Sequence, residues 1–187
     1  NLAGIREAAD GIEIGAMTRQ ADVLASDLVK SRLPLLTRAL VHVGHIQTRA
    51  RGTIGGSCCH LDPSAEQPAM CAALDAEFVV VGPGGRRVIA AGEWFEGLLQ
   101  SALGEQEFLE VIRFKPWADG HGYGFAEYAR RHGDFAIAGA AALLEVGRDG
   151  RITRAALLSF GVEAAPKRLS EAERTLIGQH VDSLDIK

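Results

Sequence analysis

The stretch that decides the fold runs from Arg49 to Ser57 and reads RARGTIGGS. Its consecutive glycines, Gly55 and Gly56, lack Cβ atoms, so the backbone can approach a ligand closely and can adopt positive φ. The hydroxyl groups of Thr53 and Ser57 flank the pair, and hydroxyls together with backbone amides suit a phosphate. The local pattern therefore leaves two interpretations open: a phosphate-binding loop, or a tight turn that only joins two elements.

The common phosphate motifs do not decide between these interpretations. The stretch contains neither the GK[ST] ending of a Walker A loop nor the third glycine of GxGxxG. Arg49 and Arg51 lie close enough in sequence to add positive potential. The paired glycines alone thus indicate where a ligand would lie, without naming it.

The composition is that of a globular chain with one domain or two small ones. The 187 residues are 47% hydrophobic and 24% charged, with a mean hydropathy of +0.06 and a net charge of −4, which disfavours nucleic acid as a partner. We expect no membrane span, because no apolar run approaches the roughly 20 residues needed. The first residues lack the basic and apolar regions of a signal peptide.

The cysteines favour a reducing compartment, and we expect a cytoplasmic location. Cys58, Cys59 and Cys71 are an odd number and two are adjacent, which argues against a disulfide framework. There is no CxxC pair, and only His60 stands beside them, so we expect no metal site. The simplest interpretation makes them small buried hydrophobic residues.

The first two thirds of the sequence predict strands mixed with short helices. Strands are expected at 11–16, 77–81, 86–90 and 109–114, with the middle two forming a hairpin around Gly82–Gly85. One helix is expected from an N-cap at Thr18 to about Leu24, and a second from a cap at Ser26. A third begins at Pro34, presents Leu36, Leu40 and Val43 on one face, and ends at Gly44. Asp62-Pro63 and Pro68 signal the start of a short helix that buries Met70, Ala73 and Leu74.

The best boundary between two lobes lies at 116–124, which is rich in glycine and proline. Beyond it we expect strands at 125–129, 135–146 and 151–162, the last two joined by a turn at 147–150. Ser170 and Glu173 are spaced as a capping box for a helix that ends near Gly178. This order of elements predicts an α+β fold.

Two further polar groups have alternative interpretations. His132 and Asp134 flank Gly133 and are either an acid/base pair or a solvated turn. Glu66 either binds hydroxyl groups of a ligand or is an acidic residue favoured in a first helical turn. The sequence has no GxSxG elbow, so a hydrolytic triad is not expected.

Residues 42–57, reading HVGHIQTRARGTIGGS, resemble the flavin-binding subunit of the molybdenum hydroxylases, together with Asp62-Pro63 and Glu66-Gln67-Pro68. The resemblance is to the medium subunit of aerobic carbon monoxide dehydrogenases and to its relatives in the xanthine dehydrogenase family. It continues in residues 74–76 (LDA) and 129–136 (ARRHGDFA), and so spans nearly the whole chain.

The resemblance implies two domains. Residues 1–117 are expected to form the second part of an FAD-binding domain of the vanillyl-alcohol oxidase/PCMH type. Residues 122–187 are expected to form the small α+β C-terminal domain of the flavin subunit. The family's own Ala-Gly-Gly-x-Ser phosphate loop, on an N-terminal βαβ unit, is absent from the sequence. We therefore expect a polypeptide longer at both ends, and an FAD site only partly built by this chain.

The resemblance also implies a set of cofactor-binding residues. The FAD diphosphate and ribityl chain are expected along Thr53, Ile54, Gly55, Gly56 and Ser57. Glu66 is expected to bind a ribityl hydroxyl, Val43 and Gly44 to lie beside the adenine or the flavin edge, and Leu109 to lie on a strand that packs against the cofactor. Ala126 stands where some relatives have a lysine near the flavin.

The function that follows from the resemblance is electron transfer in an oxidoreductase. Electrons would pass from molybdenum, held as a molybdopterin cofactor in a large partner subunit, through the 2Fe-2S clusters of a small subunit to FAD and an external acceptor. A dimer of heterotrimers is implied, and this chain needs no catalytic residue of its own. The alternative is a non-catalytic scaffold or binding module that keeps the fold without flavin.

Overall fold

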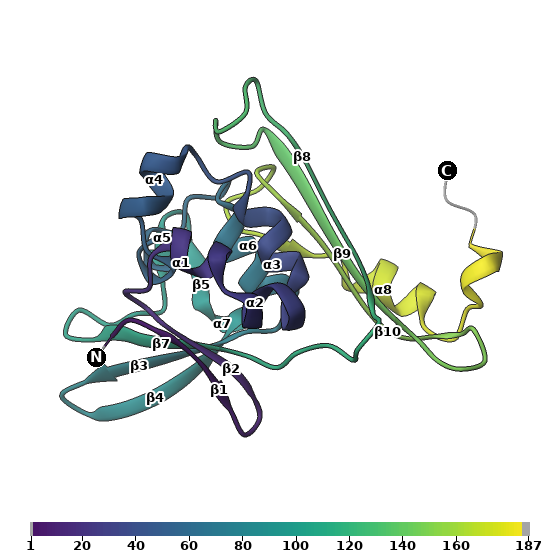
Figure 1. Ribbon diagram of the computed structural model, residues 1–187, viewed down its shortest axis with the longest axis horizontal. Helices are drawn as coiled ribbons and strands as arrows, with labels where there is room; N and C mark the ends of the chain where they lie inside the picture. The colour runs from purple at the N-terminus through teal and green to yellow at the C-terminus, as the bar shows by residue number, and fades with distance from the viewer. Residues whose placement is uncertain (1, 185–187) are drawn as a thin grey trace.

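The computed structural model describes residues 2–184, in which two antiparallel sheets enclose a layer of helices (Figure 1). The first sheet has five strands in the order β1-β2-β7-β3-β4. These strands are β1 (Ile5–Ala8), β2 (Gly11–Gly15), β7 (Phe108–Phe114), β3 (Glu77–Gly82) and β4 (Gly85–Ala90). The strands expected at 11–16, 77–81, 86–90 and 109–114 are thus confirmed, and β1 is an additional strand.

The register of this sheet separates an apolar face from a charged one. Ile14 pairs with Ile112, which pairs with Phe78, and all three are fully buried. One residue further along each strand, Glu13 pairs with Arg113, which pairs with Glu77. Because side chains alternate between faces of a strand, the first set lies against the helices and the second on the outer face.

Six short helices lie on the side of the apolar face (Figure 1). They are α1 (Gln20–Ala25), α2 (Asp27–Arg32), α3 (Pro34–Leu40), α4 (Ile46–Arg51), α5 (Ile54–His60) and α6 (Glu66–Ala73). The expected cap at Ser26 is confirmed, since its hydroxyl accepts a hydrogen bond from the Val29 amide, and Pro34 is the first residue of α3.

Three local expectations about these helices are wrong. Thr18 does not cap α1, because its hydroxyl is hydrogen-bonded to the backbone of Gly4, and Arg19 occupies the N-cap. Helix α3 ends at Leu40, so Gly44, at φ +47°, serves the turn before α4 instead. Asp62 does not begin a helix. It holds a turn by accepting a hydrogen bond from the Ser64 amide, and α6 starts at Glu66.

A short connection packs against the centre of the first domain. Helix α7 (Ala91–Trp94) is followed by β5 (Phe95–Gly97) and β6 (Gln100–Ser101), which pair with each other. The buried Trp94 ring stacks on Phe78 at 4.2 Å between centroids. Its indole N–H donates to the Cys58 carbonyl oxygen at 2.7 Å, which fastens α5 to the core.

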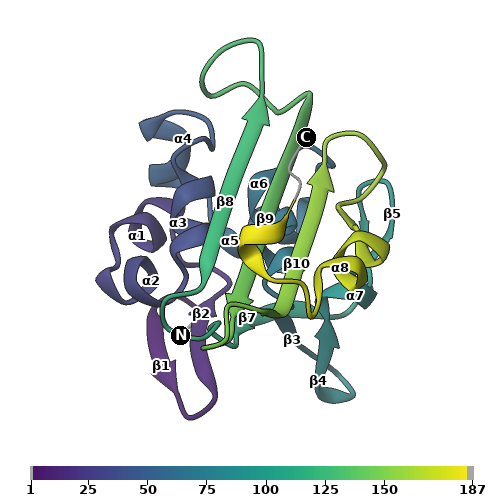
Figure 2. The same cartoon turned by 90° about the vertical axis from the view of Figure 1, so that its right-hand side faces the viewer.

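The second sheet lies on the opposite side of the helices. It has the order β11-β10-β9-β8, formed by β8 (Gly122–Tyr128), β9 (Ala138–Val146), β10 (Ile152–Phe160) and β11 (Lys167–Arg168). Figure 2 shows this sheet face-on, with the helices of the first domain behind it and α8 (Ser170–Leu176) in front. A 3-10 helix (Val181–Ser183) follows. The predicted α+β class is confirmed.

The prediction of a capping box at the start of α8 is wrong. Leu169 is the N-cap residue and Ser170 lies inside the helix. The Glu173 carboxylate instead accepts hydrogen bonds from the Leu157 amide and the Arg168 guanidinium, at 2.8 and 2.7 Å. The Glu173 carboxylate, which the local pattern assigns to the start of the helix, therefore bonds to β10 and β11 instead.

Ion pairs join the two lobes at one end of α6. The Arg168 guanidinium contacts the Asp75 carboxylate at 2.6 Å and the Ala72 carbonyl oxygen at 3.1 Å. Arg154 contacts the same aspartate at 3.2 Å and lies 3.8 Å above the Trp117 ring. These contacts fix the second sheet against the helical layer and so fix the cleft described next.

Candidate ligand-binding cleft

A cleft of about 470 Å³ lies where the first turns of α1 and α5 face the segment that leads into α6. A volume of this size is typical of sites for small molecules and cofactors. It is lined by Met17, Arg19, Gln20, Val43, Thr48, Arg51, Gly52, Thr53, Gly56, Ser57, His60, Asp62, Ala65, Glu66 and Phe135. Five of the residues expected to bind FAD are in this set: Val43, Thr53, Gly56, Ser57 and Glu66.

The paired glycines form the first turn of α5. The sequence pattern suggested a loop or a tight turn, but Thr53 is the N-cap of a helix, and its hydroxyl accepts a hydrogen bond from the Gly56 amide at 3.1 Å. Gly56 is exposed to the cleft. Gly55 faces the opposite way, where a Cβ atom would lie 2.6 Å from the Ala16 carbonyl oxygen. One glycine therefore opens the cleft, and the other lets α5 pack closely against the end of β2.

Polar groups at the start of α1 complete one wall of the cleft. Gln20 is 5% exposed, and its Oε1 atom is buried without a hydrogen-bond partner among residues 2–184. Arg19 donates a hydrogen bond to the Arg51 carbonyl oxygen, and both arginines line the cleft. An unpaired buried oxygen costs stability unless a ligand or water donates to it. The sequence pattern did not identify Arg19 or Gln20 as site residues.

Glu66 supplies a buried carboxyl group at the other side of the cleft. It is the first residue of α6 and is 4% exposed. Burial, together with the smaller effects of the Glu127 and Asp62 charges, raises the pKa of Glu66 to about 7, although a hydrogen bond from its own backbone amide acts in the opposite direction. The carboxyl group thus changes its protonation near neutral pH.

Four other expected residues lie away from the cleft lining. Ile54 and Gly55 belong to the first turn of α5 and lie on its buried side. Gly44 lines a neighbouring hollow with His45, Ile46, Gln47, Arg49 and His132. Leu109 is in the core, on β7, the strand on which α5 packs.

The other residues that the sequence singled out lie in different surroundings in the structure. His132 lies near His42, with their ring centroids 6.2 Å apart, while the Asp134 side chain is exposed. Ala126 is exposed on β8. Cys58 and Cys71 are buried, with their sulfur atoms 3.7 Å apart. Within residues 2–184 no group of three or more His, Cys, Asp or Glu side chains is arranged to hold a metal ion.

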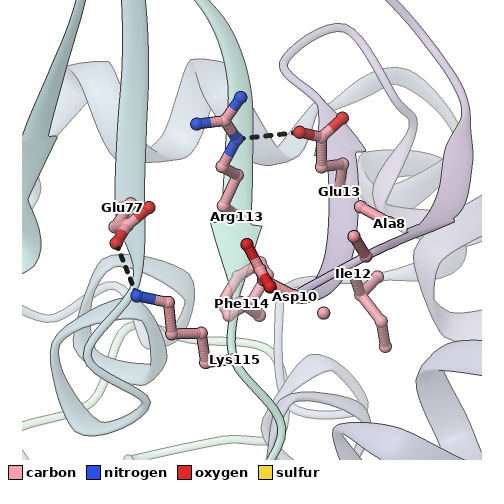
Figure 3. A pocket seen from close by; sticks show the side chains of 10 residues that line it. Ala8, Asp10, Ile12, Glu13, Glu77, Arg113, Phe114 and Lys115 are labelled. Carbon is pink, nitrogen blue, oxygen red and sulfur yellow. Dashed lines mark hydrogen bonds and ion pairs between the residues drawn. The ribbon is translucent and has the colours of Figure 1, made fainter.

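A second hollow, of about 300 Å³, lies on the outer face of the first sheet (Figure 3). Its charged side chains pair across neighbouring strands: the Arg113 Nε atom contacts Glu13 at 2.7 Å, and the Lys115 amino group contacts Glu77 at 3.0 Å. Because these groups neutralise one another, the two ion pairs leave less unpaired charge for a ligand than the cleft does.

Two family models cover almost the entire chain. One, described as the FAD binding domain in molybdopterin dehydrogenase, matches residues 1–117. The other, described as the CO dehydrogenase flavoprotein C-terminal domain, matches residues 123–186.

Individual relatives agree with these matches. The chain is 37% identical over 185 residues to the 6-hydroxypseudooxynicotine dehydrogenase complex subunit alpha of Paenarthrobacter nicotinovorans, covering 99% of this chain and 62% of that protein. It is 34% identical over 182 residues to the carbon monoxide dehydrogenase medium chain of Afipia carboxidovorans, covering 97% and 63%. The reconstituted CO dehydrogenase from Oligotropha carboxidovorans contains a chain that superimposes with a TM-score of 0.92 at 34% identity, covering 96% and 62%.

The chain spans somewhat less than two thirds of the length of these curated relatives. None of the helices within residues 2–184 has both the length and the apolar character required to cross a membrane.

Proposed function

The chain belongs to the family of FAD-binding domains of molybdopterin dehydrogenases, and from this premise we propose that it serves as the electron-transferring part of a flavin subunit in a molybdenum hydroxylase complex. The observation that carries the proposal is the cleft, whose lining combines a helix start without side-chain bulk, two arginines and Gln20, a buried residue with an unpaired oxygen. Bound FAD would supply the redox chemistry, accepting electrons from molybdenum through 2Fe-2S clusters and passing them to an external acceptor.

The residues at the start of α5 fit the anionic part of such a cofactor. Gly56 presents a backbone without a side chain, and Thr53 and Ser57 add hydroxyl groups that can donate to phosphate oxygens. Arg19 and Arg51 supply positive charge on the same wall. We propose that these residues bind the diphosphate, while Ile54 and Gly55, on the buried side of α5, and Leu109, on β7, hold the helix in place.

The remaining cleft residues fit the uncharged parts of the cofactor. Phe135 is 62% exposed and offers an aromatic surface, and Val43 offers an apolar one with Gly44 beside it. Gln20 has a free oxygen that accepts a hydrogen bond from a hydroxyl or amide, and Glu66 lies within reach of the same space. We propose Gln20 and Glu66 as partners of the ribityl hydroxyls or the flavin ring edge.

We also propose the domain division and the assembly. Residues 1–117 would form part of the FAD-binding domain and residues 122–187 the C-terminal domain. The partners would be a molybdenum-binding large subunit and a 2Fe-2S small subunit, arranged as a dimer of heterotrimers. The support is the similarity to named subunits of dehydrogenase complexes.

The proposal is tested by filling the cleft from Gly56. We expect the full-length protein to purify with the absorption spectrum of bound flavin. The Gly56→Leu variant should lose most of that flavin while keeping its circular dichroism spectrum and its melting temperature within a few degrees, because Gly56 is exposed and an added Cβ atom, 2.9 Å from the Thr53 hydroxyl, displaces only that capping group.

The matched control is Gly92→Leu in α7. Gly92 is also an exposed helical glycine, and an added Cβ atom there meets open space. It should retain flavin as the wild type does. A Gly56→Leu variant that binds flavin normally would remove the cleft as the binding site. A folded wild-type protein that binds no flavin would instead favour the non-catalytic scaffold.

A further inference from the structure

The second sheet ends in a strand whose outer edge has no partner strand. Strand β8 is the last strand of that sheet, and among the described residues it pairs with β9 alone. Figure 2 shows β8 at the margin of the sheet, with α3 beside it. Since a strand offers backbone N–H and C=O groups on both of its edges, β8 presents one row of donors and acceptors that no other strand uses.

The other edges of the two large sheets are short or charged. Strand β11 has only two residues, β1 has four, of which Arg6 and Glu7 are charged, and β4 contains two adjacent arginines. Short or charged edge strands prevent the addition of a further strand. Strand β8 is seven residues long and contains no proline, lysine or arginine. Its one charged residue, Glu127, is 5% exposed and is already held by the His42 ring at 3.1 Å.

A hollow of about 260 Å³ lies between β8 and the exposed side of α3. Its apolar surface includes Val41, which is 39% exposed, and Tyr123 of β8, which is 47% exposed. Because neighbouring strands lie about 4.8 Å apart, a strand added to β8 would pass beside this hollow and direct every second side chain toward it. The lining residues are Lys30, Pro34, Thr37, Arg38, Val41 and Tyr123.

The lining of this hollow carries positive charge and no carboxylate. Arg38 is exposed and forms no ion pair within residues 2–184, whereas Arg113 and Arg168 each contact a carboxylate. Lys30 contacts Asp27 at 3.0 Å, but this pair is solvent-exposed and so contributes little. On a chain with a net charge of −4, the hollow is therefore a basic site that favours an acidic partner.

We propose that the free edge of β8 and the hollow beside α3 form a docking site for an extended acidic segment of a partner polypeptide, which adds to the sheet as a further strand. Backbone hydrogen bonds to β8 would supply affinity, and acidic side chains directed at Arg38 and Lys30 would supply selectivity. A second copy of this chain fits less well, because its β8 has no exposed acidic side chain to offer. The hollow shares no lining residue with the cleft, so the proposal does not depend on flavin binding.

The first experiment measures binding of a defined peptide to the full-length protein. The labelled probe reads Thr-Glu-Thr-Val-Thr-Glu-Thr, so that its two glutamates and its valine share one face of an extended strand. We expect saturable binding in fluorescence anisotropy. A peptide with lysine in place of both glutamates should bind at least roughly tenfold more weakly because its charge is reversed. The acidic peptide with N-methylated backbone amides should weaken similarly, because it cannot donate hydrogen bonds to β8.

The matching variant of the protein is Arg38→Glu, which should weaken binding of the acidic peptide by roughly tenfold or more. The control is Arg148→Glu, in the turn between β9 and β10, which is also an exposed arginine without an ion pair among the described residues. It should bind the peptide as the wild type does. The proposal is overturned if the wild type does not bind the acidic peptide, if it binds the lysine or N-methylated peptide equally well, or if both variants behave alike.

The second experiment locates the bound peptide by hydrogen–deuterium exchange. Saturation with the acidic peptide should slow exchange of the amides in β8, while those of the charged edge strand β4 should exchange as before. Peptide binding without protection of β8 would contradict the addition of a strand. A dimeric protein whose β8 amides are already protected without peptide would assign this edge to a second copy and would likewise overturn the proposal.

Discussion

Glu13 and Glu66 are buried to similar degrees in two regions of the molecule, yet their pKa values move in opposite directions. Glu13 is 9% exposed on the outer face of the first sheet and Glu66 is 4% exposed at the cleft. A hydrogen bond from Arg113, supported by Arg6, lowers the pKa of Glu13. Burial and neighbouring carboxylates raise that of Glu66 to about 7.

The difference shows what each region is built for. On the sheet face, Arg6, Glu13 and Arg113 alternate in sign across adjacent strands, so every charge has a partner and the arrangement stabilises the register. At the cleft, Gln20 keeps a buried oxygen without a partner among residues 2–184. Polar groups left unpaired in this way cost stability, and their presence indicates a site where a ligand completes the bonding.

The largest effect is expected at Gly55, where the cleft helix α5 meets the strand that carries Glu13. In Gly55→Ala the new methyl group would lie 2.6 Å from the side chain and carbonyl oxygen of Ala16, so α5 must move away from β2. We expect a loss of about 3 kcal/mol in the free energy of unfolding, measured by urea denaturation. Gly92→Ala, which meets open space, should cost nothing or stabilise slightly. Equal losses in both variants would contradict the close packing of α5.

The next effect tests the sign of the electrostatics at the cleft. The pKa of Glu66 is raised from 4.5 to about 7 on folding, so the folded state binds more protons than the unfolded state between these pH values. The free energy of unfolding of the wild type should therefore decrease as the pH rises from 4.5 to about 7. Each pKa unit corresponds to about 1.4 kcal/mol, so at pH 8 Glu66→Gln should stabilise the protein by at most about 3 kcal/mol. At pH 4 the variant and the wild type should be equally stable. Destabilisation by this variant at pH 8 would show that a charged Glu66 is well accommodated.

Glu13→Gln should have the opposite sign and a smaller size. The amide weakens the bonds to Arg113 and Arg6, and we expect a loss of about 1 to 2 kcal/mol at pH 7. Because the pKa of Glu13 is lowered on folding, its contribution is present above its unfolded pKa and is lost as the pH falls below about 4.5. The cost of the substitution, measured by thermal unfolding, should therefore shrink at pH 3. A cost that does not depend on pH would show that packing, not charge, stabilises this face.

The sheet of the first domain was predictable because its signals are local. Residues 77–81 are rich in β-branched and apolar side chains, and Gly82–Gly85 marks the turn to the next strand, so pattern alone locates β3 and β4. The same holds for β7. The start of α5 was not predictable in this way, since glycine is a poor helix former. It is helical because Thr53 caps it and because Gly55 fits against Ala16, a contact between residues far apart in sequence.

The candidate site was predictable only in part, for a similar reason. Thr53, Gly56 and Ser57 belong to one continuous motif, so a resemblance could locate them together. Gln20 carries no motif, and its unpaired oxygen becomes evident only when α1 is placed beside α5. Ser170 and Glu173 show the reverse case, in which a good local pattern is overridden by the bonds that Glu173 forms with Arg168 and the Leu157 amide.

The smallest change in stability is expected at two helix caps, one at the cleft and one elsewhere in the helical layer. Thr53 caps α5 at the cleft and Ser26 caps α2 away from it, each through a hydroxyl that accepts a backbone hydrogen bond. Replacing either residue by alanine should lower the free energy of unfolding by about 1 kcal/mol. If the start of α5 binds the ligand, only Thr53→Ala should also weaken flavin binding, because it removes a hydroxyl from the cleft and loosens the turn that presents Gly56. Equal flavin retention in the two variants, at equal losses of stability, would mean that the cap serves the fold alone and that the cofactor contacts lie elsewhere.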